Sequence, residues 1–316
     1  MGCKRALICG YYGQGNAGDE ALLVALLQML PTGVEPIVIS ANPSQTQQLY
    51  GVASCPRTDT FTLLKAFKYT DLFIWGGGSL MQDVTSLKSP IYYASLMSLA
   101  QAKKLKTVAW AQGIGPLNSA FSRWLTKRVL KGCTAVSVRD NKSAQIVKEW
   151  GIEALIAPDP VWALNAKPLQ LELLSSPRVA VALRSHPLLT SKRLAILTQA
   201  LLNFQAATNA SVLLIPFQPA KDLAIAQAIS QKLPVEKQQI IDLTEPRELK
   251  AVFQTVKMTI GMRYHSLIMA GSEGSICFAL SYDPKVTQLM QELNLPGWEL
   301  SQLPNEAEVI TQAWLE

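Results

Sequence analysis

Histidine is scarce in this sequence of 316 residues, and its cysteines are not paired. The two histidines are His186 and His265, and the five cysteines form no Cys-x-x-Cys pair. Neither a zinc site of the usual ligand spacing nor a disulfide framework is therefore expected. Unpaired thiols fit a reducing compartment, so we expect a cytoplasmic protein.

Charged residues are also few, and they do not form runs. They make up 16% of the sequence, hydrophobic residues make up 49%, and the formal net charge is +6. The high hydrophobic content predicts a folded chain and argues against disorder. The positive balance favours acidic partners, but no run of Lys and Arg marks a nucleic-acid-binding arm. We expect no nucleic-acid partner.

Long apolar segments are missing as well. No stretch approaches the roughly 20 apolar residues that a membrane-spanning helix needs. The short apolar run near the N-terminus, Ala6 to Cys9, is too short for the core of a signal peptide. No transmembrane segment is therefore expected.

The sequence does contain a regular alternation of short β-rich apolar runs and longer amphipathic segments. This alternation is typical of βαβ units and predicts parallel sheets. A proline-rich stretch, residues 157–177, interrupts it and suggests a linker. We predict two Rossmann-like domains facing a central cleft, an N-terminal one at 1–165 and a C-terminal one at 166–316. The predicted strands are 5–10, 36–40, 71–75, 107–111, 135–139, 179–183, 212–216, 239–243, 258–261 and 276–280, and predicted helices include 20–30, 91–103, 119–130 and 191–207.

The segment Gly261-Met-Arg-Tyr-His265, followed by Asp283-Pro-Lys285, carries the clearest chemical signal. It joins a predicted strand to a predicted helix, which is where open α/β sheets place active sites. Arg263 and Lys285 suit a phosphate or carboxylate, and histidine, here His265, is the residue type most often used to transfer protons. The pattern indicates anion binding with acid catalysis. The alternative is that Arg263 pairs with a surface carboxylate and His265 only begins a helix.

Other predicted strand ends also carry residues suited to a ligand. Gly77 and Gly78, in Trp75-Gly-Gly-Gly-Ser79, allow a ligand to approach the backbone or simply let the strand turn sharply. Arg139 ends another strand, and the adjacent Asp140 is a candidate ion-pair partner for it. His186 follows a strand of the C-terminal domain, where a loop position without a role is the favoured interpretation.

The first predicted strand runs into Gly13-Gln-Gly15-Asn-Ala-Gly18-Asp-Glu20, which has the G-x-G-x-x-G spacing of dinucleotide-binding turns. No acid stands at the end of the second strand to bind a ribose, and Asp19 and Glu20 would repel a pyrophosphate. Dinucleotide binding is therefore disfavoured. Two interpretations stay open: the acids stabilise the helix start, or they and Asn16 bind sugar hydroxyls.

In this order, the motifs resemble those of the polysaccharide pyruvyl transferases, specifically the CsaB type, and the resemblance runs almost end to end. The series is Gly15-Asn-Ala-Gly-Asp-Glu20, Trp75-Gly-Gly-Gly-Ser79, Gln112-Gly-Ile-Gly-Pro116, Ser137-Val-Arg-Asp140, Pro158-Asp-Pro160, Gly261-Met-Arg-Tyr-His265 and Tyr282-Asp-Pro-Lys285.

The resemblance implies a GT-B-like two-domain fold and transfer of the enolpyruvyl group of phosphoenolpyruvate to a sugar, with release of phosphate and formation of a 4,6-pyruvyl ketal. It implies catalytic roles for His265, Arg139 and Lys285, and no metal or other cofactor. The phosphoenolpyruvate ligands would be Arg139, Arg263, His265 and Lys285. The acceptor side would be the N-terminal domain, with Gly15, Asn16, Asp19, Glu20, Gly77 and Gly78.

Simple chemistry agrees with these roles. Phosphoenolpyruvate carries a carboxylate and a phosphate, so about three cations suit it, and Arg139, Arg263 and Lys285 supply three. Protonation of its methylene carbon creates an oxocarbenium-like centre that a sugar hydroxyl attacks, and His265 is the candidate acid.

Two other functions fit parts of the pattern. A nucleotide-sugar glycosyltransferase would use an acid of the C-terminal domain on the donor ribose, and Glu273 is the nearest candidate. A saccharide-binding module without catalytic activity would not need His265 together with Arg139 and Lys285. By the resemblance, the acceptor is a cell-surface polysaccharide or its lipid-linked precursor. The positive net charge suits peripheral contact at the inner face of the plasma membrane.

Overall fold

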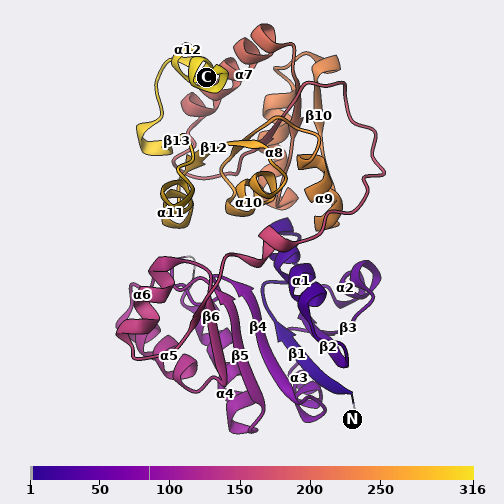
Figure 1. Ribbon diagram of the computed structural model, residues 1–316, viewed down its shortest axis with the longest axis vertical. Coiled ribbons are helices and arrows are strands. Elements are labelled where there is room, and N and C mark those ends of the chain that lie inside the picture. The colour runs from indigo at the N-terminus through magenta and orange to yellow at the C-terminus, as the bar shows by residue number, and fades with distance from the viewer. Residues whose placement is uncertain (1–2, 85) are drawn as a thin grey trace. The chain divides into compact units, whose positions relative to one another are not determined.

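The computed structural model describes residues 3–84 and 86–316. The chain divides into two compact units, residues 1–164 and 165–316, and each contains one parallel β-sheet flanked by helices (Figure 1). The fold class predicted from the alternation of strands and helices, two parallel-sheet α/β domains, is confirmed.

Unit 1 contains a seven-stranded sheet in the order β3-β2-β1-β4-β5-β6-β7. Its strands are β1 (Lys4–Cys9), β2 (Val34–Ser40), β3 (Ala53–Pro56), β4 (Leu72–Gly78), β5 (Lys106–Gln112), β6 (Ala135–Val138) and β7 (Leu155–Ile156). Its helices are α1 (Ala17–Met29), α2 (Pro43–Tyr50), α3 (Thr60–Lys68), α4 (Lys88–Ala102), α5 (Ala120–Lys131), α6 (Asn141–Glu149) and the 3₁₀ turn η1 (Pro160–Ala163).

Unit 2 contains a six-stranded sheet in the order β10-β9-β8-β11-β12-β13. Its strands are β8 (Arg178–Ala182), β9 (Ser211–Leu214), β10 (Gln238–Ile240), β11 (Met258–Gly261), β12 (Ile276–Ser281) and β13 (Gly297–Glu299). Its helices are α7 (Ser191–Thr208), α8 (Pro219–Ser230), α9 (Pro246–Phe253), α10 (Tyr264–Ser272), α11 (Pro284–Leu293) and α12 (Ala307–Leu315), with 3₁₀ turns η2 (Val235–Lys237) and η3 (Leu300–Gln302).

The central strands are buried on both faces, which explains their continuous apolar runs. In unit 1, Leu7 and Phe73 belong to a core under α3, α4 and α5, while Ile8 and Ile74 belong to a second core under α1. Neighbouring residues of one strand therefore fill opposite sides of the sheet, as the alternation of side chains along a strand requires. Unit 2 has a comparable core between its sheet and α7, α8 and α12.

The predicted strands are all present, within a few residues at each end. Three short strands escaped prediction: β3, β7 and β13, which lie at or next to the sheet edges. The proline-rich stretch predicted as a linker contains η1, which belongs to unit 1. There Gln28 Nε2 of α1 donates a hydrogen bond to the carbonyl oxygen of Ala163 at 2.9 Å. Over the described ranges, no helix combines the length and the apolar character of a membrane span.

Candidate active site

Each sheet has one point where the direction of strand order reverses. In unit 1 it lies between β1 and β4, and in unit 2 between β8 and β11. The loops that leave the carboxyl ends of such neighbouring strands run in opposite directions, and ligands of open α/β sheets bind in the crevice that results. Most of the residues predicted for the site lie in these loops or next to them.

In unit 1 the loop after β1 is closed by the carboxylate of Glu20. One oxygen, Oε1, accepts a hydrogen bond from Gly13 N at 2.7 Å, and Oε2 accepts one from the Tyr50 hydroxyl at 3.0 Å. Glu20 is buried, and burial raises the pKa of its carboxyl group to about 7. Glu20 therefore has a structural role in the loop, and its contact with a sugar stays a prediction.

Asn16 and Asp19 form the half-buried part of the same loop. The Asn16 side chain caps α1 by accepting a hydrogen bond from Gly18 N at 3.2 Å, and its amide group donates to the Asp19 carboxylate. Asp19 Oδ1 lies 3.5 Å from the position that a Cβ atom at Gly78 would take. The structure thus brings Asn16, Asp19 and the end of β4 together at the switch point of unit 1.

Gly77 and Gly78 end β4 with φ angles of +92° and +90°. Side chains other than glycine rarely adopt this left-handed backbone, so the two glycines are required for the turn. They also leave the carboxyl end of β4 without side chains next to Asp19. Of the two explanations that the sequence left open, the structure shows the sharp turn; both glycines are buried, and approach of a ligand to their backbone stays a prediction.

Glu20 leads to a prediction about the pH dependence of stability. Its folded pKa, about 7, lies above the unfolded value of 4.5, so the folded protein keeps a proton that the unfolded chain loses between these two values. The stability that the protonated Glu20 carboxyl group contributes is complete below pH 4.5 and is lost as pH rises through about 7. Across this window we expect wild type to lose roughly 2 to 3 kcal/mol relative to Glu20→Gln, which does not titrate.

Denaturant unfolding of the two proteins at pH values spanning this window measures the effect. Tyr50→Phe provides a second test, because loss of its hydrogen bond to the ionised carboxylate should shift the window to higher pH. A constant difference between wild type and Glu20→Gln would show that the carboxyl group titrates as in the unfolded chain.

Arg139 forms a buried ion pair. Its Nη1 lies 2.6 Å from Asp159 Oδ2, the two side chains are 3% and 1% exposed, and its Nη2 donates to Ser79 Oγ at 3.1 Å. Asp140, the partner considered from the sequence, accepts a hydrogen bond from Ser143 N and caps α6. Arg139 thus joins three motifs of the sequence. It lies in the Ser-Val-Arg-Asp segment, its ion pair reaches the Pro-Asp-Pro segment, and its hydrogen bond to Ser79 reaches the glycine-rich end of β4.

Arg263 forms a second buried ion pair, within unit 2. Its Nε and Nη2 lie 3.0 Å and 2.7 Å from Asp222 Oδ2, and Asp222 also accepts a hydrogen bond from Gln218 N at 2.8 Å. The alternative raised from the sequence, a carboxylate partner for Arg263, is thus present, but the pair is buried and not at the surface. It ties the first turn of α8 to the residue that caps α10.

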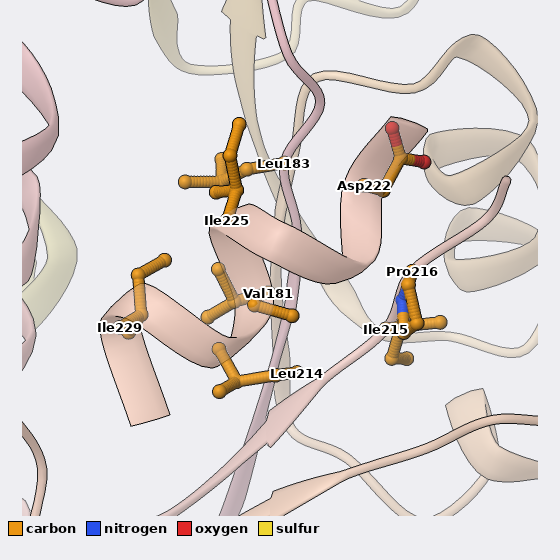
Figure 2. Close-up of a pocket in the computed structure, with 9 residues that line it drawn as sticks. Val181, Leu183, Leu214, Ile215, Pro216, Asp222, Ile225 and Ile229 are labelled. Carbon is orange, nitrogen blue, oxygen red and sulfur yellow. The ribbon is translucent and has the colours of Figure 1, made fainter. Parts of the chain in front are cut away.

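Asp222 also lines a small pocket under α8. Figure 2 shows Asp222 at one end of this pocket, on the first turn of the helix, and apolar side chains such as Val181 and Leu214 along the rest. An anionic substrate would gain nothing from an apolar lining and would be repelled by the carboxylate. We therefore do not assign the donor to this pocket.

His265 and Lys285 stand at the starts of two neighbouring helices of unit 2. His265 is the second residue of α10, which follows β11, and it is half-buried. Lys285 lies in the first turn of α11, which follows the adjacent strand β12. Its Nζ is 3.7 Å from Asp283 Oδ2, and 41% of its side chain is exposed. Both residues are therefore at the carboxyl edge of the sheet, as predicted.

Sequence reasoning missed Arg184 and Tyr282. Arg184 Nη1 donates to the Tyr282 hydroxyl at 2.7 Å, and its guanidinium carbon lies 4.9 Å from the centre of the Tyr282 ring. The His186 ring packs on the same tyrosine at 4.7 Å. Burial, with Arg184 nearby, lowers the pKa of His186. Since Tyr282 follows β12 and Arg184 follows β8, this cluster spans the end of β11, which lies between those strands.

The missed signal is a repeated tripeptide. Both histidines of the chain stand in an Arg-x-His sequence, Arg184-Ser-His186 and Arg263-Tyr-His265. These tripeptides follow β8 and β11, the two strands on either side of the switch point of unit 2. Their shared placement puts His186 at the same edge of the sheet as His265, and the interpretation of His186 as a loop histidine without a role stays a prediction.

Glu273, the acid considered for a nucleotide sugar, is already engaged. Its carboxylate pairs with the buried Lys250 at 3.2 Å and accepts a hydrogen bond from Gln254 Nε2 at 2.8 Å. It lies at the C-terminal end of α10, whereas the switch-point loops lie at the other end of that helix. Within residues 3–84 and 86–316, no three His, Cys, Asp or Glu side chains are placed to hold a metal ion.

Comparison with known families gives one match that covers most of the chain. A family model described as polysaccharide pyruvyl transferase matches residues 16–284. The chain belongs to this family. The matched range includes Arg139, Arg184, Arg263 and His265, and it ends one residue before Lys285. A search of curated proteins gave no match.

Solved structures match the fold over nearly the whole chain. The UDP-GlcNAc 2-epimerase from Methanocaldococcus jannaschii is 11% identical, with a TM-score of 0.65 and coverage of 99% of this chain and 92% of the other. The Neisseria meningitidis enzyme bound to UDP-GlcNAc is 10% identical, with a TM-score of 0.64 and coverage of 99% and 90%. A glycosyltransferase from Rickettsia africae is 13% identical, with a TM-score of 0.57 and coverage of 98% and 86%. At these identities the comparison establishes the GT-B-like fold alone.

Proposed function

We propose that this member of the polysaccharide pyruvyl transferase family is of the CsaB type. In this proposal it transfers the enolpyruvyl group of phosphoenolpyruvate to a sugar, forms a 4,6-pyruvyl ketal and releases phosphate. The observation that carries the proposal is the position of His265, on the first turn of α10 at the switch point of unit 2, with Arg263 two residues before it and Lys285 at the next strand end.

The cations available to phosphoenolpyruvate fall into two groups. Arg139 and Arg263 are held by buried carboxylates, so their charges are already balanced. Lys285 is half-exposed and lies 3.7 Å from Asp283 Oδ2, where solvent weakens the pairing, and Arg184 donates a hydrogen bond to the hydroxyl of Tyr282. We assign the main electrostatic attraction to Lys285 and Arg184. Arg263 uses Nε and Nη2 on Asp222, and its Nη1 group adds a further donor, because a guanidinium has five N–H bonds.

In the proposed reaction, His265 donates a proton to the methylene carbon of phosphoenolpyruvate, which becomes a methyl group. The first sugar hydroxyl attacks the adjacent carbon and returns its proton to His265. The bond from that carbon to the phosphate oxygen then breaks, and the second hydroxyl closes the ketal and gives its proton to the leaving phosphate. Phosphate leaves with the electrons of the broken bond, while Lys285 and Arg184 balance its charge. No metal or other cofactor takes part.

The acceptor sugar is assigned to unit 1. Asn16 and Asp19 present an amide and a carboxylate beside the glycine-lined end of β4, which suits sugar hydroxyls. Gly15 is exposed in this loop, Gly77 and Gly78 end β4 without side chains beside Asp19, and Glu20 holds the loop in place. In the same proposal the acceptor is a cell-surface polysaccharide or its lipid-linked precursor. The enzyme then works in the cytoplasm, at the inner face of the plasma membrane.

Lys285→Ala tests the donor assignment. Loss of a charged hydrogen-bond donor should weaken phosphoenolpyruvate binding by roughly 1.5 to 3 kcal/mol, as measured by isothermal titration calorimetry. Lys167→Ala is the matched control, because Lys167 is also a half-exposed lysine of unit 2 paired with a carboxylate, at 3.0 Å from Glu248 Oε1. Equal affinities of wild type and Lys285→Ala would place the donor elsewhere.

The reaction itself is tested by phosphate release from phosphoenolpyruvate. Purified protein is assayed alone and with a panel of β-linked galactose, glucose and N-acetylmannosamine acceptors. The proposal predicts release that depends on one of these acceptors. No release across the panel, together with a thermal shift on addition of a nucleotide sugar, would favour the glycosyltransferase considered from the sequence.

A further inference from the structure

Helix α5 of unit 1 has an unusual distribution of side chains. The residues that it buries against the core include Ser122 and Thr126, whereas Phe121 and Trp124 are 52% and 53% exposed. Thr126 satisfies its buried hydroxyl by donating to the carbonyl oxygen of Ser122 at 2.7 Å. Folding alone would favour burial of the two aromatic rings, which are the largest apolar groups of the helix. Their exposure suggests a contact outside the chain.

The rest of the outer face of α5 is basic. It carries Arg123, Lys127, Arg128 and Lys131, and the Arg128 guanidinium lies 5.5 Å from the centre of the Trp124 ring. In the part of the chain that the structure describes, none of these four cations is in an ion pair with a carboxylate. The helix therefore presents two aromatic rings stacked on each other and four unneutralised positive charges.

The apolar surface extends beyond α5. Val84, Leu87 and Ile91, which are 62%, 53% and 45% exposed, lie in the loop before α4 and in its first turn. Asp83 joins this loop to the start of α5, because its carboxylate accepts hydrogen bonds from Asn118 N and Ser119 N, each at 2.8 Å. We name the docking surface as Val84, Leu87, Ile91 and the outer face of α5.

The sequence around this surface is free of acids. Between Asp83 and Asp140 there is no Asp or Glu, and there are nine Lys and Arg residues. The whole chain has a formal net charge of only +6, so the remainder of the chain is net negative. Although no run of more than two consecutive basic residues occurs, this stretch of unit 1 carries an excess of positive charge.

We infer that the docking surface binds the anionic surface of a phospholipid bilayer. Exposed Trp and Phe beside Lys and Arg are typical of protein segments that lie at the membrane interface, where the rings enter the headgroup layer and the cations pair with lipid phosphates. A second copy of the chain is a poor occupant, because a symmetric contact would bring the four cations of each α5 face to face. The inference does not depend on the reaction proposed above.

The test is co-sedimentation of the purified full-length protein with lipid vesicles. We expect it to bind vesicles of phosphatidylcholine mixed with phosphatidylglycerol, to bind phosphatidylcholine vesicles much less, and to be released as salt is raised. Arg128→Gln with Lys131→Gln should lower the partition coefficient about 30-fold, since each cation near an anionic surface contributes about a factor of five. Phe121→Ser with Trp124→Ser should lower it by about 10-fold or more.

Tyr69→Ser is the matched control. Tyr69 is a 52% exposed aromatic residue with the ammonium group of Lys68 at 5.7 Å from its ring centre, but it follows α3, at the amino edge of the sheet. The Tyr69→Ser variant should bind vesicles as wild type does. The Trp124→Phe variant, which keeps an aromatic ring, should retain most of the binding. Unchanged thermal unfolding of each variant shows that the fold is retained.

Equal binding to both kinds of vesicle, or wild-type binding by the α5 variants, would overturn the inference. So would a dimer in light scattering that becomes monomeric in Trp124→Ser, because the surface would then belong to a second copy. Binding of a single-stranded oligonucleotide that is lost in the same variants, without vesicle binding, would assign the surface to nucleic acid.

Discussion

Replacement of His265 by glutamine is expected to lower the turnover number by about 10²- to 10⁴-fold, the usual contribution of a positioned general acid. Glutamine keeps hydrogen-bonding groups at this position but cannot deliver a proton at neutral pH. The residue lies on the first turn of α10, and its neighbour Ser266 anchors that turn by donating to the carbonyl oxygen of Arg263 at 2.6 Å. The fold should therefore survive the substitution.

His186→Gln separates the two Arg-x-His tripeptides. The pKa of His186 is lowered, first by burial and then by Arg184, so a smaller fraction of the ring is protonated at a given pH than in a free histidine. We expect its replacement to reduce turnover far less than that of His265. Steady-state rates of both variants, with circular dichroism to check the fold, measure the difference. A larger loss in His186→Gln would mean that the acid is His186.

Asp222→Ala is expected to destabilise unit 2 by about 3 to 5 kcal/mol, because it leaves the Arg263 guanidinium buried without its partner. Replacing both residues, as Asp222→Leu with Arg263→Met, should recover much of this loss, since a well-packed apolar pair can be as stable as a buried ion pair. If the double variant is more stable than Asp222→Ala, the stability lost in Asp222→Ala is due to the unpaired charge of Arg263.

Glu35→Gln supplies the comparison for an exposed ion pair. Arg5 Nε lies 3.2 Å from Glu35 Oε2, with side chains 50% and 56% exposed, and its removal should change stability by less than about 1 kcal/mol. Denaturant unfolding of the full-length variants, with hydrogen exchange of the amides of α8 and α10, measures the losses and locates them. A loss in Asp222→Ala no larger than that in Glu35→Gln would contradict the role given to the buried pair.

The fold could be predicted because its signal is local. Central strands such as β1 and β4 are apolar on both faces, and helices such as α7 begin at a capping residue, here Thr190. The edge strands lack this signal: β7 has two residues, Leu155 and Ile156, and both are exposed. Nothing in so short and exposed a segment distinguishes it from a loop.

The placement of the candidate residues was predictable where it depends on position along a strand, and not where it depends on contacts. Strand ends located Arg139, His265 and Lys285 at the carboxyl edges of the sheets, and their roles stay predictions. The carboxylates that pair with the two arginines, Asp159 and Asp222, are 20 and 41 residues away in sequence, so no local pattern identified them. Arg184 could have been found from the repeated Arg-x-His tripeptide, but its contact with Tyr282 spans 98 residues.

The ion pairs change the picture of the donor site. From the sequence, Arg139 and Arg263 were simply two of the cations for phosphoenolpyruvate. In the structure each is already held by a buried carboxylate, which fixes its guanidinium and lowers its net attraction for an anion. In the proposed reaction, such pairing favours a role in orientation for Arg263 and Arg139, and Lys285 and Arg184 supply the main attraction for the substrate.

The most direct test of the central claim is the reaction run in heavy water with phosphoenolpyruvate and a sugar acceptor, followed by mass spectrometry and proton NMR of the product. Proton donation to the methylene carbon predicts a pyruvyl ketal on the sugar with one deuterium in its methyl group, formed in step with phosphate release and lost in His265→Gln. Phosphate release that yields only free pyruvate, or a sugar product without the ketal, would contradict the account.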